Sequence, residues 1–264
     1  MTIELYRERS YARCIKDGFD FLTKNLSLVT KIMMPYFIVV ALLLTVMNAD
    51  FLYVNVCSLA NIEVEYPALL LGLLIIPVLL VAVMLTQGRL FLMYRRLSGL
   101  TVNPPLWRLA AKSLVGIVLL PLFFTPLVYV YHAWMMKPLE EDAAPFSLKD
   151  EMRRGCRHWA KILGVVLFAG FIFLLAACVL VLPYIAAVST YFASIEGKVN
   201  FNDTALIPTS GYVGMMLLCI LAYSLIFLFG VFYQTSLLLL YGDIARKLKT
   251  PSQPSQGGVE GPIR

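Results

Sequence analysis

The residues that could carry out chemistry are few, and none has the spacing of a catalytic or metal site. The chain has two histidines, His132 and His158, and five cysteines that are scattered without a Cys-x-x-Cys pair. It contains no HExxH, no GxSxG, no phosphate-binding glycine loop and no pair of acids within an apolar run. The sequence therefore predicts a protein that is not an enzyme, with no catalytic residues, no metal site and no cofactor.

Three polar side chains beside or within long apolar runs remain as candidates for binding: Gln87, Arg89 and Gln234. The two glutamines sit in matching patterns, since Gln87, Leu90, Tyr94 and Leu97 are spaced like Gln234, Leu237, Tyr241 and Ile244. Their amides could face each other, either as a hydrogen bond between helices worth about 0.6–2 kcal/mol or as the lining of a polar pocket. Arg89 could anchor its helix by reaching toward the membrane surface, or contact an anionic substrate.

The elements that position these residues belong in a membrane. Of the 264 residues, 60% are hydrophobic and only 14% are charged, which is too little polar surface to cover a soluble globule. The mean hydropathy is +0.79. Because the basic residues behind the net charge of +6 adjoin apolar runs, we expect anionic lipid headgroups as partners, and no nucleic acid.

Four apolar runs are long enough to cross a hydrocarbon core of about 30 Å, and they cover residues 32–54, 68–94, 162–193 and 211–241. A fifth region, 113–136, is divided by Pro121 and Pro126. If it enters and returns as a broken or re-entrant hairpin, every one of the 22 basic residues except Lys198 lies on one side. Basic loops stay in the cytoplasm, so we prefer the hairpin to a single crossing and expect both termini to be cytoplasmic, in a bacterial inner membrane.

Two basic amphipathic segments each run directly into an apolar run, the first within Glu4 to Phe37 and the second around Gly155. Gly18 and Gly155, 137 residues apart, align these segments and predict two related halves, about 4–97 and 146–248, joined by the hairpin. We interpret each segment as a helix lying on the inner leaflet, although an ordinary solvated helix face is the alternative. The predicted headgroup contacts are Arg9, Arg13, Lys16, Lys24, Arg153, Arg154, Arg157 and Lys161.

These observations predict an all-α fold: a transmembrane helical bundle of about six membrane segments in two related halves, within one domain of residues 1–249. Residues 250–264, rich in Pro, Gly, Ser and Gln, are expected to form a disordered cytoplasmic tail.

The stretch from Phe146-Ser147-Leu148 through Met152-Arg153-Arg154-Gly155-Cys156-Arg157-His158-Trp159 resembles the amphipathic segment before the fifth span of the YciC-like family. These are bacterial inner-membrane proteins related to the membrane domain of some glycerophosphodiester phosphodiesterases. The resemblance implies a polytopic inner-membrane protein. It implies no phosphodiesterase activity, since no catalytic domain is attached, and the family's third and fourth spans are longer than Ser113 to Met136.

The sequence favours a non-enzymatic role in membrane or envelope organisation, lipid interaction or assembly with a protein partner or a second copy of the chain. The alternative is a small permease or lipid transporter with a cavity between the two halves.

Overall fold

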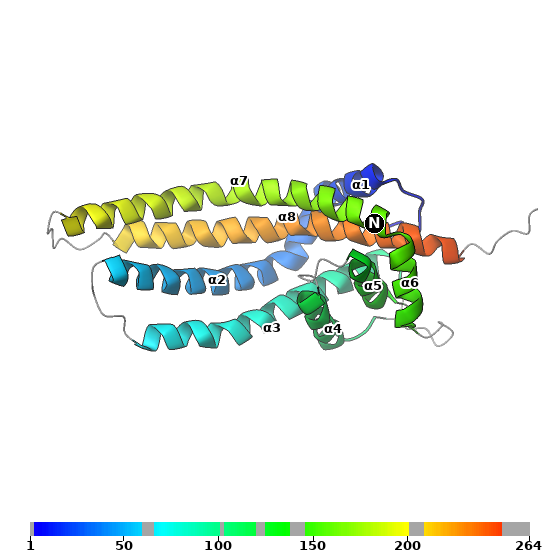
Figure 1. Ribbon diagram of the computed structural model, residues 1–264, viewed down its shortest axis with the longest axis horizontal. Helices are drawn as coiled ribbons and strands as arrows, with labels where there is room; N and C mark the ends of the chain where they lie inside the picture. The colour runs from blue at the N-terminus through cyan, green and yellow to red at the C-terminus, as the bar shows by residue number, and fades with distance from the viewer. Residues whose placement is uncertain are drawn as a thin grey trace, which may run out of the picture.

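The computed structural model describes residues 3–59, 66–100, 103–119, 125–137, 146–200 and 209–249. Within these ranges the chain forms eight α-helices and no strand (Figure 1), which confirms the all-α prediction. The helices are α1 Tyr11–Lys24, α2 Leu26–Leu59, α3 Tyr66–Leu97, α4 Leu106–Leu119, α5 Thr125–Met136, α6 Leu148–Arg157, α7 Trp159–Asn200 and α8 Thr209–Lys249.

Four helices among the described residues are long and apolar enough to cross a membrane, which is consistent with a membrane protein. The candidate spans are Leu26–Leu52, Leu73–Leu97, Trp159–Gly197 and Gly211–Arg246. They match the four long apolar runs, but the first begins at Leu26 instead of residue 32. Pro183 lies inside α7 and does not end it, because the helix continues to Asn200.

The region expected to form a hairpin contains two short helices, α4 and α5. With 14 and 12 residues they rise about 21 and 18 Å, which is less than the hydrocarbon core. The first arm of the expected hairpin, α4, begins at Leu106 and not at residue 113. Pro104 and Pro105 come directly before it, and proline is favoured at the start of a helix. The turn between the arms, 120–124, and the tail, 250–264, lie outside the described residues.

The two amphipathic helices, α1 and α6, begin in the same way. The side chain of Ser10 accepts a hydrogen bond from the N–H of Arg13, and that of Ser147 accepts one from the N–H of Asp150, both at 3.3 Å. Each helix is separated by a single residue, Asn25 or His158, from the long helix that follows. Arg9, which the sequence placed on the basic face of the first helix, lies before the N-cap and outside α1.

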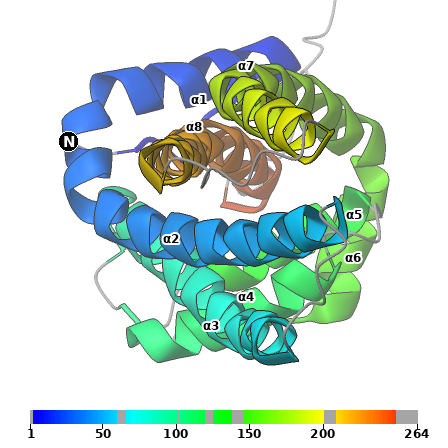
Figure 2. The same ribbon diagram turned by 90° about the vertical axis from the view of Figure 1, so that its left-hand side faces the viewer.

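The helix α8 lies at the centre of the bundle. It packs against α1, α2 and α7, while α3 packs on α2 and α4 packs on α3 (Figure 2). The short helices α1, α4, α5 and α6 gather at one end, which we name the capped end (Figure 1). At the opposite end, the residues that the structure describes belong to the four long helices α2, α3, α7 and α8. The N-terminal segment and the last turns of α8 both lie at the capped end, where Arg246 of α8 binds Glu8 at 2.9 Å.

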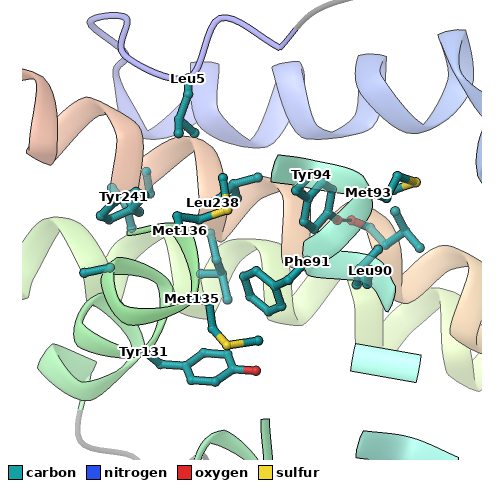
Figure 3. Packing of buried hydrophobic residues seen from close by; sticks show 14 of the residues in the cluster. Leu5, Leu90, Phe91, Met93, Tyr94, Tyr131, Met135, Met136, Leu238 and Tyr241 are labelled. Carbon is teal, nitrogen blue, oxygen red and sulfur yellow. Dashed lines mark hydrogen bonds between the residues drawn. The ribbon is translucent and has the colours of Figure 1, made fainter. Parts of the chain in front are cut away.

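The buried core is concentrated at the capped end. Figure 3 shows side chains of α3, α5 and α8 meeting there, with Leu5 entering from the N-terminal segment. The candidate spans instead expose many large apolar side chains, such as Leu74, Phe168 and Leu217, a surface that suits contact with lipid chains. The capped end therefore has the packing of a soluble core, and the rest of the bundle has the surface of a membrane protein.

Candidate functional site

A pocket of about 240 Å³ lies between α2, α3, α7 and α8. All thirteen lining residues fall inside the four helices that are long and apolar enough to cross a membrane. Its wall is mostly apolar, with Phe37, Val83, Phe173 and Phe227 among the lining side chains.

The polar groups of the pocket are gathered toward the capped end. Gln87 of α3 and Gln234 of α8 line the same pocket. The apolar residues Val83 and Ile226 lie one to two helical turns farther from the capped end on the same two helices. The pocket is thus amphipathic along the bundle axis.

The two amides are not bonded to each other. The Oε1 atoms of Gln87 and Gln234 are both buried, and neither has a hydrogen-bond partner in the part of the chain that the structure describes. A buried polar atom without a partner costs about 1–3 kcal/mol. The interhelical amide bond that the sequence suggested is therefore absent, and the two carbonyl oxygens are left as acceptors.

His132 of α5 is a further buried polar side chain at the capped end. This histidine is 2% exposed, and its Nδ1 lies 2.8 Å from the carbonyl oxygen of Val128, an acceptor that requires a proton on Nδ1. The Nε2 of His132, which has no hydrogen-bond partner within the described residues, is then an acceptor.

The capped end of the pocket is closed by packed side chains. Leu90 lines the pocket, and one turn farther the buried Tyr94 hydroxyl lies 2.8 Å from the hydroxyl of Thr235. Phe91 is also fully buried, and its ring meets the edge of Tyr131 at 5.4 Å between centroids. The sequence analysis missed Thr235 and Tyr94 as a polar link between α3 and α8, although Tyr94 belongs to the matched pattern.

Arg89 does not join the two glutamines. Residues two positions apart point to opposite sides of a helix, so Arg89 faces away from Gln87 toward a second pocket, beside Leu28 and Ile32 of α2. Its guanidinium lies 6.0 Å from the ring centroid of Tyr36. The three residues grouped by the sequence thus line two separate pockets, Gln87 and Gln234 one and Arg89 the other.

The eight predicted headgroup contacts divide into three groups. Arg9 is 5% exposed and binds Asp17 at 2.9 Å, and Lys161 binds Asp243 at 2.5 Å, so both are committed to internal partners. Lys24 and Arg154 pair with acids on their own helices, at 3.5 Å and 2.7 Å. The exposed residues without an ion pair in the described ranges are Arg13, Lys16, Arg153 and Arg157.

Comparisons of the chain with protein-family models, with curated proteins and with solved structures find no match. Among the described residues, no group of three His, Cys, Asp or Glu side chains could hold a metal ion. The amphipathic pocket is accordingly the candidate site that the geometry itself provides.

Proposed function

We propose that this chain is a non-enzymatic protein of the bacterial cytoplasmic membrane whose function is to bind a lipid in the pocket between α2, α3, α7 and α8. The observation that carries this proposal is the pair of carbonyl oxygens without hydrogen-bond partners in the described residues, on Gln87 and Gln234, in a mostly apolar pocket. Apolar side chains accommodate an acyl chain, and two acceptors at the polar end call for a group that donates hydrogen bonds.

The ligand that fits this chemistry is an amphiphile with a hydroxyl donor, such as a monoacylglycerol. An ammonium headgroup fits less well, because no acidic side chain lines the pocket among the described residues. The volume of about 240 Å³ is below the 300–1,000 Å³ that is usual for a whole ligand, so part of the acyl chain would extend into the bilayer.

The surrounding architecture supports a membrane location for this activity. The exposed basic residues of α1 and α6 would hold the capped end on the anionic inner leaflet, with both termini in the cytoplasm. The helices α4 and α5 would form a hairpin that enters and returns from the cytoplasmic side, which brings the number of membrane segments to six. The aligned N-caps Ser10 and Ser147, again 137 residues apart, support a design of two related halves.

The orientation is testable with a membrane-impermeant thiol reagent. In intact spheroplasts we expect labelling of Cys57 and protection of Cys156, because the sequence places Cys57 outside and Cys156 in the cytoplasm. Labelling of Cys156 with protection of Cys57 would reverse the orientation.

The lipid-binding function is tested by native mass spectrometry of the detergent-purified protein titrated with monooleoylglycerol and with methyl oleate, which has no donor. We expect monooleoylglycerol to bind about tenfold more tightly, since two hydrogen bonds are at stake. The Gln87→Leu/Gln234→Leu variant should lose this preference. Asn48→Leu is the matched control: Asn48 donates to the Tyr223 hydroxyl at 2.9 Å, within the spans but outside the pocket.

Equal binding of the two lipids by the unmodified chain would contradict the proposal. The other candidate, a small permease, would be favoured if proteoliposomes moved a polar solute in a manner that depends on Gln87 and Gln234. The mostly apolar wall of the pocket favours lipid binding over that alternative.

A further inference from the structure

A second pocket, of about 190 Å³, lies on the outer side of α2 and α3, away from the glutamines. Two arginines of α3, Arg89 and Arg96, line it, and its other lining residues are all Leu, Ile or Met. Seven residues correspond to nearly two full turns, so both arginines lie on one face of α3, about 10 Å apart along the helix. The two guanidinium groups therefore lie on the same side of α3, beside the apolar side chains that line the pocket.

Neither arginine is neutralised by the protein. Within the described ranges neither Arg89 nor Arg96 forms an ion pair, and no acidic side chain lines the pocket. The Nε of Arg89 is buried without a hydrogen-bond partner in the same ranges. Arg95, between them in sequence, behaves differently: it is buried and donates to the carbonyl oxygens of Met135 and Lys137 at 3.2 and 2.6 Å.

The two arginines lie toward the capped end of the candidate span Leu73–Leu97. Arg89 lies eight residues, about 12 Å, before the end of this span, a distance over which a long arginine side chain can reach toward the lipid headgroups. Arg96 lies one residue before the end of the candidate span, Leu73–Leu97. This placement holds whichever side of the membrane the capped end faces.

We infer that Arg89 and Arg96 bind the headgroup of an anionic phospholipid whose acyl chain lies against Leu28 and Ile32. Guanidinium groups bind phosphate oxygens through paired, charge-assisted hydrogen bonds, and basic pockets between transmembrane helices are suited to anionic headgroups. A zwitterionic headgroup fits less well, because its ammonium group would meet two cations and no carboxylate. This inference rests on the proposed membrane location. It does not depend on what binds in the first pocket, lined by Gln87 and Gln234, which we call the glutamine pocket.

The test is a native mass spectrometry titration of the detergent-purified protein with phosphatidylglycerol and phosphatidylcholine of identical acyl chains. We expect preferential binding of phosphatidylglycerol, and an affinity about fivefold weaker for each arginine removed in Arg96→Gln and Arg89→Gln/Arg96→Gln. Arg96 is exposed, so its single variant should fold as the unmodified chain does.

The matched control is Arg7→Gln/Arg246→Gln, which removes the same charge from two arginines that are already paired, with Glu4 and Glu8. It should retain phosphatidylglycerol binding.

An equal loss of phosphatidylglycerol affinity in both double variants would mean that only net charge matters, and it would overturn the inference. Equal affinity of the unmodified chain for phosphatidylglycerol and phosphatidylcholine would also overturn it. Displacement of phosphatidylglycerol by millimolar inorganic phosphate would overturn the lipid as ligand in favour of free phosphate. The monooleoylglycerol preference tested above should be unchanged in every variant, so failure of one site is distinguishable from failure of the other.

Discussion

The carboxylate of Asp243 accepts a hydrogen bond from the backbone N–H of Arg9 at 2.8 Å, although 234 residues separate them. The other oxygen of Asp243 accepts from the Lys161 ammonium, which also donates to the backbone carbonyl of Arg9 at 2.7 Å. One acid thereby joins the N-terminal segment, α7 and α8 at the capped end. Asp243 is 4% exposed, so this junction is shielded from water.

Removal of this carboxylate should destabilise the protein strongly. We expect Asp243→Ala to lower the free energy of unfolding by about 3–5 kcal/mol, because Lys161 is left partly buried without its partner. Glu8→Ala is the control: it removes an acid from the same end, but Glu8 is exposed and its pair with Arg246 is worth about 0–1 kcal/mol. Thermal unfolding in detergent measures both, and similar losses in the two variants would contradict the role given to Asp243.

Gly242 is required by the close passage of the N-terminal segment over α8. A Cβ added there would lie closer to the Leu5 carbonyl oxygen than any real contact allows, and this obstacle is backbone. We expect Gly242→Ala to lower the free energy of unfolding by about 1–3 kcal/mol. Gly214, on the same helix, has open space around it, so Gly214→Ala should be neutral or slightly stabilising. Equal effects at both positions in thermal unfolding would show that the N-terminal segment is not packed on Gly242.

Cys14 should be unreactive in the folded protein. It is fully buried in α1, and burial raises the pKa of its thiol to about 11. The thiolate is the reactive form, so labelling of Cys14 by a maleimide at pH 7.5 should require unfolding and should accelerate as the pH rises toward 11. Cys156 is exposed and should react first. Peptide mapping by mass spectrometry measures the labelling of Cys14 and Cys156 separately. Early labelling of Cys14 would contradict the packing of α1 on α8.

The same raised pKa predicts a pH dependence of stability. The unfolded thiol loses its proton near pH 9.0, and the folded one only near pH 11. The unfolded state therefore binds fewer protons between these values, and the contribution of Cys14 to stability falls as the pH rises through that window. Cys14→Ala should remove this part of the alkaline destabilisation, as followed by unfolding temperature at pH 8 and pH 10.

The patterns of apolar residues along the sequence predicted the features that depend on the length and composition of single helices. The four long apolar runs identified the candidate spans, because the length and composition of a helix decide whether it can cross a bilayer. The matching patterns paired Gln87 with Gln234, and both residues line one pocket. The separation of Arg89 from Gln87 could also have been predicted, since a spacing of two on a helix places side chains on opposite sides.

The partners of the charged residues could not be predicted. Arg9 and Lys161 look like surface cations in sequence, and the acid that both contact, Asp243, is 234 and 82 residues away. The contact between the rings of His132 and Phe91, 5.6 Å between centroids, depends on how α5 packs at the capped end, which the periodicity of either helix does not determine. Long-range packing of this kind decides which basic residues remain available to lipids.

The occupancy of the glutamine pocket by lipid is the central claim, and photo-crosslinking tests it most directly. Cells expressing the chain would be supplied with a fatty acid that carries a diazirine in its acyl chain, irradiated, and analysed by mass spectrometry of the purified protein. We expect crosslinks enriched on Val83, Ile226 and Phe227, and reduced there in the Gln87→Leu/Gln234→Leu variant. Crosslinks spread evenly over outward residues such as Leu74 and Phe168, with no enrichment in the pocket, would contradict the account.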